Sequence, residues 1–206
     1  MHALEKGARF RVYLYEDGNI KKSFVSPAVV KDSDNTGFGN SIALKSNFLI
    51  VGSLFENRTG AAWLFNLKTP SAKPKRLAIP NRANGRTVTV SKRFAAVGID
   101  NPFQLPSSTQ TLVVSMEDGS TTLVEGVGKL SSDNNILAIM LPYKSRGGYT
   151  QEALLRVYDL TNINKPRLIV KQGGINNAYV QNNFLTTIKK NYDEAKTKIC
   201  IEQIIK

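Results

Sequence analysis

The chain has 206 residues, 41% of them hydrophobic and 21% charged, a composition typical of a globular protein long enough to bury a core. It contains 28 Lys and Arg against 16 Asp and Glu, which gives a formal net charge of +12. The single Cys excludes a disulfide framework, and the single His, His2 beside the first residue, excludes most catalytic triads. The sequence contains no run of about 18 apolar residues, so it predicts no membrane-spanning helix.

The N-terminal part of the chain is predicted to hold two strands. Residues 1–7 show no pattern of regular structure and are predicted to be disordered, whereas residues 8–206 are predicted to form a single domain. Within residues 10–26, two strand-like stretches at 11–15 and 20–25 flank a turn that contains Asp17 and Gly18. This arrangement is typical of a hairpin.

A repeat of about 45 residues follows, which is the period of four-stranded propeller blades. Four similar apolar segments have their first large apolar residues spaced by 46, 42 and 48 positions, at Phe48, Phe94, Ile136 and Phe184. The repeat divides the chain into four units, at about residues 38–80, 84–126, 127–172 and 173–206.

Each unit is predicted to contain a first strand, an almost wholly apolar second strand, a long loop and a third strand. A fourth strand follows in the first three units. The apolar second strand indicates coverage on both faces of the sheet by neighbouring units. The predicted strands are 41–44, 47–52, 61–67 and 76–79; 87–90, 93–98, 111–116 and 121–124; 129–131, 135–140, 154–160 and 167–170; and 178–180, 183–188 and 198–201.

Two stretches resemble known propeller repeats. Residues 36–44, 48–53 and 60–65, read Thr-Gly-Phe-Gly-Asn-Ser-Ile-Ala-Leu, Phe-Leu-Ile-Val-Gly-Ser and Gly-Ala-Ala-Trp-Leu-Phe, are similar to an FG-GAP repeat. That repeat is the blade unit of integrin-α-type propellers. Residues 156–170 are similar to the strand–turn–strand of LVIVD-type repeats. Both resemblances imply a β-propeller, and the first implies recognition of a protein or a glycan.

We therefore expect an all-β chain that forms a β-propeller of about four to five four-stranded blades. Two arrangements stay open. In one, residues 11–25 pair with residues 198–204 and close the ring. In the other, the chain is a fragment of a larger propeller. A fragment of an exported FG-GAP protein would be extracellular or at the cell surface; otherwise the protein would be cytoplasmic.

One loop is a candidate calcium site. Asp32 and Asp34 stand at alternate positions before Gly37, and oxygen-rich loops of this kind hold Ca²⁺ in some proteins. The pattern lacks the further ligands of a complete calcium loop. The alternative is an inter-blade turn in which Asp and Asn side chains bind their own backbone, with no cofactor.

The basic residues are unevenly distributed. Between Asn57 and Ile99 there are nine Lys and Arg and no Asp or Glu. Such a stretch can attract nucleic acid or an acidic protein surface, although no nucleic-acid-binding motif is present. The alternative is a solvated outer edge on which Lys and Pro discourage strand addition. The candidate binding residues are Lys73, Lys75, Arg76, Arg82 and Arg86.

The sequence thus favours a non-catalytic binding or scaffolding module that recognises a protein or glycan. The expected recognition surface consists of the loops between second and third strands, at residues 54–59, 100–108, 142–150 and 189–195. An alternative from another class is a hydrolase or lyase that uses carboxylates in the central channel, with Asp100 or Asp133 as candidates.

Overall fold

The computed structural model describes residues 11–28, 36–69, 71–78, 83–100, 109–142, 153–191 and 196–204. Within these ranges the regular structure is β-strand, apart from one short 3-10 helix, η1 (Glu56–Arg58). No helix in the described part of the chain is long and apolar enough to cross a membrane.

The strands form five antiparallel groups in chain order. The N-terminal hairpin comprises β1 (Arg11–Glu16) and β2 (Asn19–Val25). Sheet I comprises β3 (Phe38–Lys45), β4 (Phe48–Ser53), β5 (Ala61–Asn66) and β6 (Lys75–Leu77). Sheet II comprises β7 (Ala83–Val90), β8 (Phe94–Asp100), β9 (Gln110–Ser115) and β10 (Thr121–Glu125). Sheet III comprises β11 (Lys129–Asp133), β12 (Ile136–Pro142), β13 (Ala153–Asp159) and β14 (Arg167–Ile175). Sheet IV comprises β15 (Asn177–Gln181), β16 (Phe184–Asn191) and β17 (Lys196–Gln203).

The prediction of an all-β chain with repeated four-stranded antiparallel sheets is confirmed. Each predicted strand overlaps a strand of the structure, and in every sheet the strands follow one another as a meander. The four anchor residues of the repeat, Phe48, Phe94, Ile136 and Phe184, each begin the second strand of their sheet.

The core consists of layers between neighbouring sheets. Ile50 of β4 packs with residues of sheet II, whereas its neighbours Leu49 and Val51 pack toward the N-terminal hairpin. Likewise Ala95 and Val97 of sheet II pack toward sheet I. The second strands of sheets I, II and III are therefore apolar at consecutive positions because another layer covers each of their faces.

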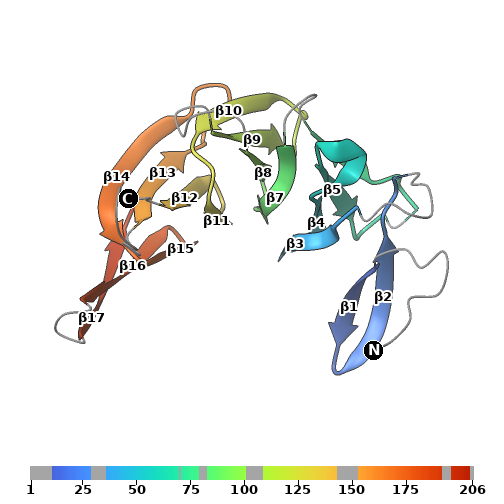
Figure 1. Ribbon diagram of the computed structural model, residues 1–206, viewed down its shortest axis with the longest axis horizontal. Helices are drawn as coiled ribbons and strands as arrows, with labels where there is room; N and C mark the ends of the chain where they lie inside the picture. Colours follow the sequence, from blue (N-terminus) through green and yellow to red (C-terminus); the bar gives the residue numbers. More distant parts are fainter. Residues whose placement is uncertain are drawn as a thin grey trace.

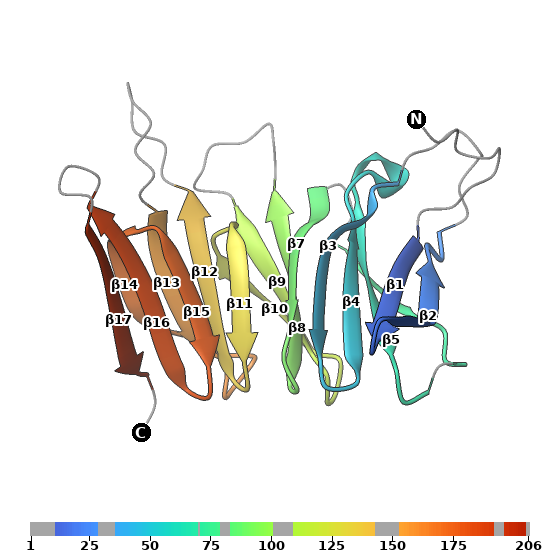
Figure 2. The ribbon, with the colours of Figure 1, turned by 90° about the horizontal axis from the view of Figure 1, so that it is seen from below.

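The sheets are arranged side by side as an arch (Figure 1). The first strands, β3, β7, β11 and β15, lie on the inner side of the arch, and β10 and β14 lie on the outer side. In sheet I, β6 is the edge strand opposite the inner strand β3. Seen from the side, the axes of all the strands point along roughly the same line, with neighbouring strands of each sheet antiparallel (Figure 2). Successive apolar layers between twisted sheets account for the curvature.

The ring is open. In the described residues β1 and β2 pair only with each other, and β17 pairs only with β16. The N-terminal hairpin and sheet IV lie at opposite ends of the arch (Figure 1). Pairing of residues 11–25 with residues 198–204, one of the two arrangements that the sequence left open, is therefore absent from this structure.

Polar contacts join the inner strands of neighbouring sheets. The Ser41 hydroxyl donates to the Gly85 carbonyl at 2.9 Å, which joins β3 to β7. The Thr89 and Ser132 hydroxyls lie 2.8 Å apart and join β7 to β11. The inner strands thus use hydroxyl groups to satisfy polar groups where the apolar layers end.

Candidate binding site

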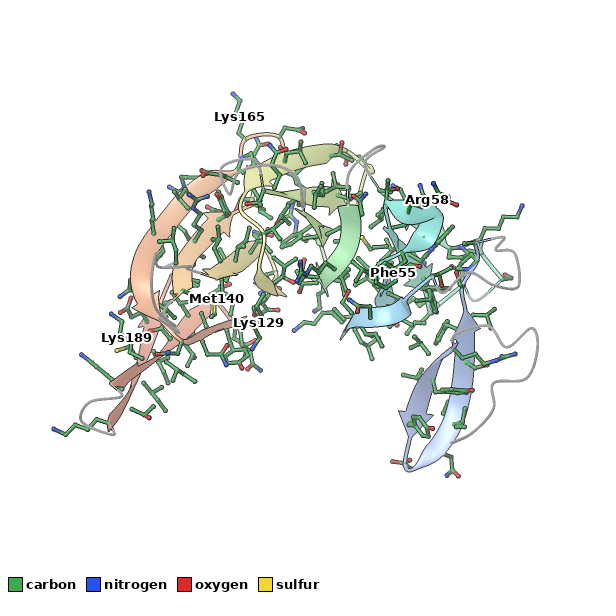
Figure 3. All side chains as sticks on the ribbon, viewed as in Figure 1. Phe55, Arg58, Lys129, Met140, Lys165 and Lys189 are labelled. Atoms are coloured by element: carbon green, nitrogen blue, oxygen red, sulfur yellow. The ribbon has the colours of Figure 1, made fainter. Side chains whose placement is uncertain are left out.

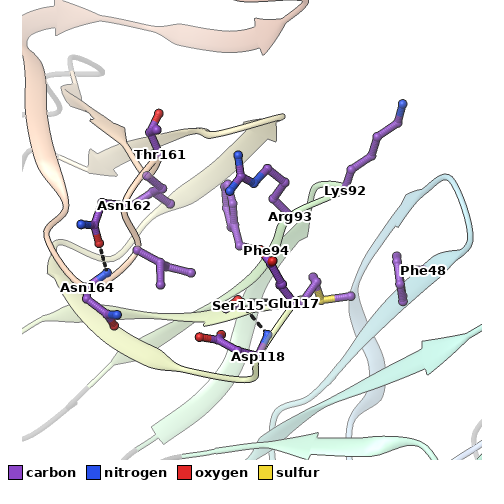
Figure 4. A pocket seen from close by; sticks show the side chains of 13 residues that line it. Phe48, Lys92, Arg93, Phe94, Ser115, Glu117, Asp118, Thr161, Asn162 and Asn164 are labelled. Atoms are coloured by element: carbon purple, nitrogen blue, oxygen red, sulfur yellow. Dashed lines mark hydrogen bonds between the residues drawn. The ribbon is translucent and has the colours of Figure 1, made fainter.

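A pocket of about 480 Å³ opens between sheets I, II and III. It lies at the end of the strands where first strands turn into second strands and third strands into fourth strands. The turns that contribute are 91–93, 115–118 and 160–164, with Phe48 of β4 at one side (Figure 4). The volume lies within the range of small-molecule sites. This pocket is at the opposite end of the sheets from the loops between second and third strands.

One wall of the pocket is cationic. Lys92 and Arg93 occupy the turn between β7 and β8, and both are exposed. The Ser91 hydroxyl shapes this turn by accepting hydrogen bonds from the backbone N–H groups of Arg93 and Phe94, each at 3.1 Å. Neither cationic side chain has a hydrogen-bond or ion-pair partner in the described part of the chain. Both are therefore available to a ligand.

The opposite wall carries carboxylates in the turn between β9 and β10. Asp118 accepts hydrogen bonds from the Ser120 backbone N–H at 2.9 Å and the Ser120 hydroxyl at 2.8 Å. Hydrogen bonds from the Ser115 hydroxyl and from Ser120 lower the pKa of Asp118 from 3.8 to about 2. Asp118 therefore stays charged, and its hydrogen bonds fix the turn beside Glu117.

Amide groups form the third wall, in the turn between β13 and β14. The Asn164 backbone N–H donates to the Asn162 side-chain oxygen at 3.1 Å (Figure 4). Asp159 holds the start of this turn, because its Oδ1 accepts from the backbone N–H and the hydroxyl of Thr161 at 2.9 and 2.7 Å. Burial by itself would raise the pKa of Asp159, but the hydrogen bonds from Thr161 and Arg167 outweigh burial and lower it.

The pocket is suited to hydrogen bonding. It combines two cations, two carboxylates, two side-chain amides and two hydroxyls with apolar side chains from the neighbouring layers. Neither His nor Cys lines it. In the described ranges no three His, Cys, Asp or Glu side chains are grouped as a metal site would require. The predicted strands leave these turns between them, but the sequence does not show that the fold brings the turns together.

The candidate basic residues do not share one surface. Lys75 and Arg76 lie on β6, the edge strand of sheet I opposite β3, and Lys73 lies just before it. Arg86 lies on β7, the inner strand of sheet II. Arg76 also forms an ion pair, because its Nε lies 2.8 Å from Glu56 Oε1. Arg82 and the candidate calcium ligands Asp32 and Asp34 lie outside the described residues.

The expected recognition loops are described only in part. Residues 54–59 contain η1, which presents Phe55 and Arg58 on the surface while Glu56 points inward and is 1% exposed (Figure 3). Most residues of the other three loops lie outside the described ranges. Asp100 is the last residue of β8, and the structure describes its backbone but not its side chain.

Asp133, the second carboxylate considered for catalysis, has a structural role. Its side chain is buried, and its oxygens bind Lys45 Nζ of β3 at 3.0 Å and the Asn182 backbone N–H at 2.6 Å. Burial alone would raise its pKa, but the hydrogen bonds from Lys45 and Asn182 lower it from 3.8. The ionised carboxylate thus links sheets I, III and IV along the inner side of the arch.

We expect Asp133→Asn to lower the free energy of unfolding by about 1–2 kcal/mol at neutral pH, because half-exposed Lys45 loses its ion pair. The folded-state pKa is depressed, so the ionised carboxylate stabilises the protein above the unfolded-state pKa and ceases to do so as pH falls through the folded-state value. The difference between variant and wild type should therefore shrink below about pH 4. Urea unfolding at several pH values measures it, with exposed Glu117→Gln as the control. A difference that is the same at acidic and neutral pH would contradict this role.

Comparison with known proteins gives the fold alone. No family model and no curated protein matches the sequence. Among solved structures, the chain is similar to the computationally designed Ika4 protein with a TM-score of 0.51 and 10% identity, over 82% of this chain and 92% of that one. It is also similar to the phage phi92 endosialidase with a TM-score of 0.40 and 10% identity, over 72% of this chain and 30% of that one.

Proposed function

We propose that this protein is a β-propeller whose four-stranded sheets are blades, and that it acts as a non-catalytic binding module for a glycan. The arch of meander sheets with their first strands on the inner side supports the propeller arrangement. The resemblance of residues 36–65 to an FG-GAP repeat points the same way. The pocket between sheets I, II and III supports the ligand class.

The observation that carries the proposal is the composition of that pocket. Sugar hydroxyl groups both donate and accept hydrogen bonds, and the three walls offer donors, charged acceptors and amides that do both. Lys92 and Arg93 line one wall of the pocket, and there they would bind the carboxylate of an acidic sugar more strongly than a neutral sugar. The turns are fixed by their own hydrogen bonds, so little conformational entropy is lost when a ligand binds.

An array of neutral and acidic glycans, followed by calorimetric titration of the best ligand, tests the proposal. We expect Arg93→Ala to weaken binding about tenfold, because a charge-assisted hydrogen bond is lost. We expect a smaller loss, about threefold to tenfold, for Asn164→Ala, which keeps the backbone N–H that Asn162 binds.

Lys165→Ala is the matched control. Lys165 is exposed, follows Asn164 directly and is absent from the pocket lining, so its replacement should leave affinity unchanged. Binding that survives both pocket substitutions would place the glycan site elsewhere. Absence of binding to every glycan, together with capture of a defined protein partner that Arg93→Ala does not affect, would replace this proposal by recognition of a protein.

A further inference from the structure

The outward face of sheet IV carries large apolar side chains that no sheet in the described part of the chain covers. The Lys129 ammonium of sheet III reaches one of them, 4.8 Å from the centre of the Tyr179 ring. The other face of sheet IV packs on sheet III through Ala178, Val180 and Leu185. The strand register places Tyr179 opposite Thr186 and Thr186 opposite Ile201, while Ile188 lies opposite Ile199. These side chains therefore share the outward face. Phe184 lies on the same face, two residues before Thr186 on β16. The large apolar residues of this surface, here called the C-terminal face, are exposed by 43%, 43%, 62% and 67% at Tyr179, Phe184, Ile199 and Ile201.

The N-terminal hairpin presents a similar surface at the other end of the arch. Val12 and Phe24 lie opposite each other and are buried against sheet I. The alternate positions point away from sheet I. There Tyr13 and Tyr15 pack ring to ring at 6.4 Å, and Ile20 lies opposite Tyr15. This surface, here called the N-terminal face, exposes Tyr13, Tyr15 and Ile20 by 47%, 59% and 56%.

The two faces hold most of the exposed large apolar side chains in the described part of the chain. Inside the arch, the equivalent faces of sheets I, II and III are covered by a neighbouring sheet. Both faces lie at the ends of the arch, with the open side of the ring between them (Figure 1). Four packed layers separate them within one molecule, so the chain cannot bring its own two faces together without breaking a layer.

We propose that the C-terminal face of one molecule packs on the N-terminal face of a second copy, and that two copies close one ring by two such junctions. A two-fold axis along the axis of the arch makes the two junctions identical, as closed symmetry requires. The seven large side chains offer about 700 Å² of apolar surface per molecule, so that two molecules together bury an area on the order of that in stable dimers. A second copy is favoured because it presents, at both ends at once, a face of matching character.

Light scattering coupled to size-exclusion chromatography, at micromolar chain concentration, tests the proposal. The wild type should have twice the mass of the 22.7 kDa chain. Ile199→Lys/Ile201→Lys on the C-terminal face and Tyr13→Lys/Tyr15→Lys on the N-terminal face should each shift the mass to that of a monomer. An equimolar mixture of these two variants should regain dimer, because one of its two junctions is then wild type on both sides.

Leu168→Lys and Leu123→Lys are matched controls on outer strands, with exposures of 45% and 42%, and should remain dimeric. A monomeric wild type would overturn the proposal, as would a dimer that survives the N-terminal substitutions, which would indicate contact between two C-terminal faces. A mass that keeps rising with concentration would overturn the closed ring. Hydrogen exchange of the wild type gives a readout without substitution: amides of β1, β2 and β17 should exchange faster on dilution.

Discussion

Gly85→Ala is expected to lower the free energy of unfolding by about 3 kcal/mol or more. Gly85 lies on β7 with φ +77°, a conformation that L side chains rarely adopt. A Cβ atom at Gly85 would lie 2.1 Å from the Ala61 carbonyl oxygen and 3.0 Å from the Ser53 backbone nitrogen. Both neighbours are backbone atoms of fully buried residues of sheet I, so neither can move aside cheaply.

This site explains glycines at the ends of the apolar strands. A Cβ at Gly52 would meet the Gly85 carbonyl oxygen at 2.1 Å, and one at Gly60 would meet the Asn84 carbonyl oxygen at 2.2 Å. Sheets I and II thus approach each other backbone to backbone, and the Ser41 hydroxyl binds the Gly85 carbonyl in the same place. The residues that resemble an FG-GAP repeat supply Gly52 and Gly60 to this contact.

Urea unfolding measures the loss, and Gly173→Ala is the matched control. Gly173 lies on β14, and a Cβ there would meet no atom within 4 Å. We expect this control to change stability by less than about 0.5 kcal/mol. If Gly85→Ala were as stable as Gly173→Ala, the close approach of sheets I and II would be wrong.

Glu56→Ala is expected to cost about 3 kcal/mol, because it leaves the buried Trp63 indole N–H without an acceptor and removes the ion pair with Arg76. Glu56 accepts a hydrogen bond from the Trp63 indole N–H at 2.6 Å and another from Arg76 Nε at 2.8 Å. Trp63 is 9% exposed and packs in the layer between sheet I and the N-terminal hairpin. Loss of the carboxylate therefore affects both the 54–59 loop and this layer.

Fluorescence of Trp63, the single Trp of the chain, follows the unfolding of this layer directly. Glu56→Gln keeps the size and one acceptor oxygen, so we expect a loss of only about 1 kcal/mol. Arg76→Ala should cost less than about 1 kcal/mol, because the Arg76 side chain is 40% exposed and the ion pair is screened by water. If Glu56→Ala unfolded at the same urea concentration as Arg76→Ala, the bond to Trp63 would contribute nothing.

The strands and their order could be predicted because their signals are local. Val51 and Val97 belong to short apolar runs, and turn residues such as Asp118 and Gly119 separate the strands that follow. Such patterns depend on the alternation of side chains and on turn conformation, which neighbouring residues largely determine. The same reasoning correctly attributed the apolar second strands of sheets I, II and III to coverage on both faces.

The candidate site could not be predicted in the same way. Lys92, Asp118 and Asn164 belong to three turns far apart in the sequence, and only the stacking of sheets II and III places them around one pocket. The basic stretch spans β6 and β7, which are neighbours in sequence but are edge strands of different sheets, β6 beside β5 and β7 beside β8.

The sequence by itself determined the all-β class, the repeat and the position of nearly every strand, since strand and turn preferences act over a few residues. The tertiary structure alone decided which charges are used internally, as for Glu56 and Asp133, and which turns meet at the pocket. It also decided that the N-terminal hairpin and sheet IV lie at opposite ends of the arch and do not pair in the described residues. These features depend on the angle at which successive sheets stack, and that angle results from the fit of all the buried side chains in each layer.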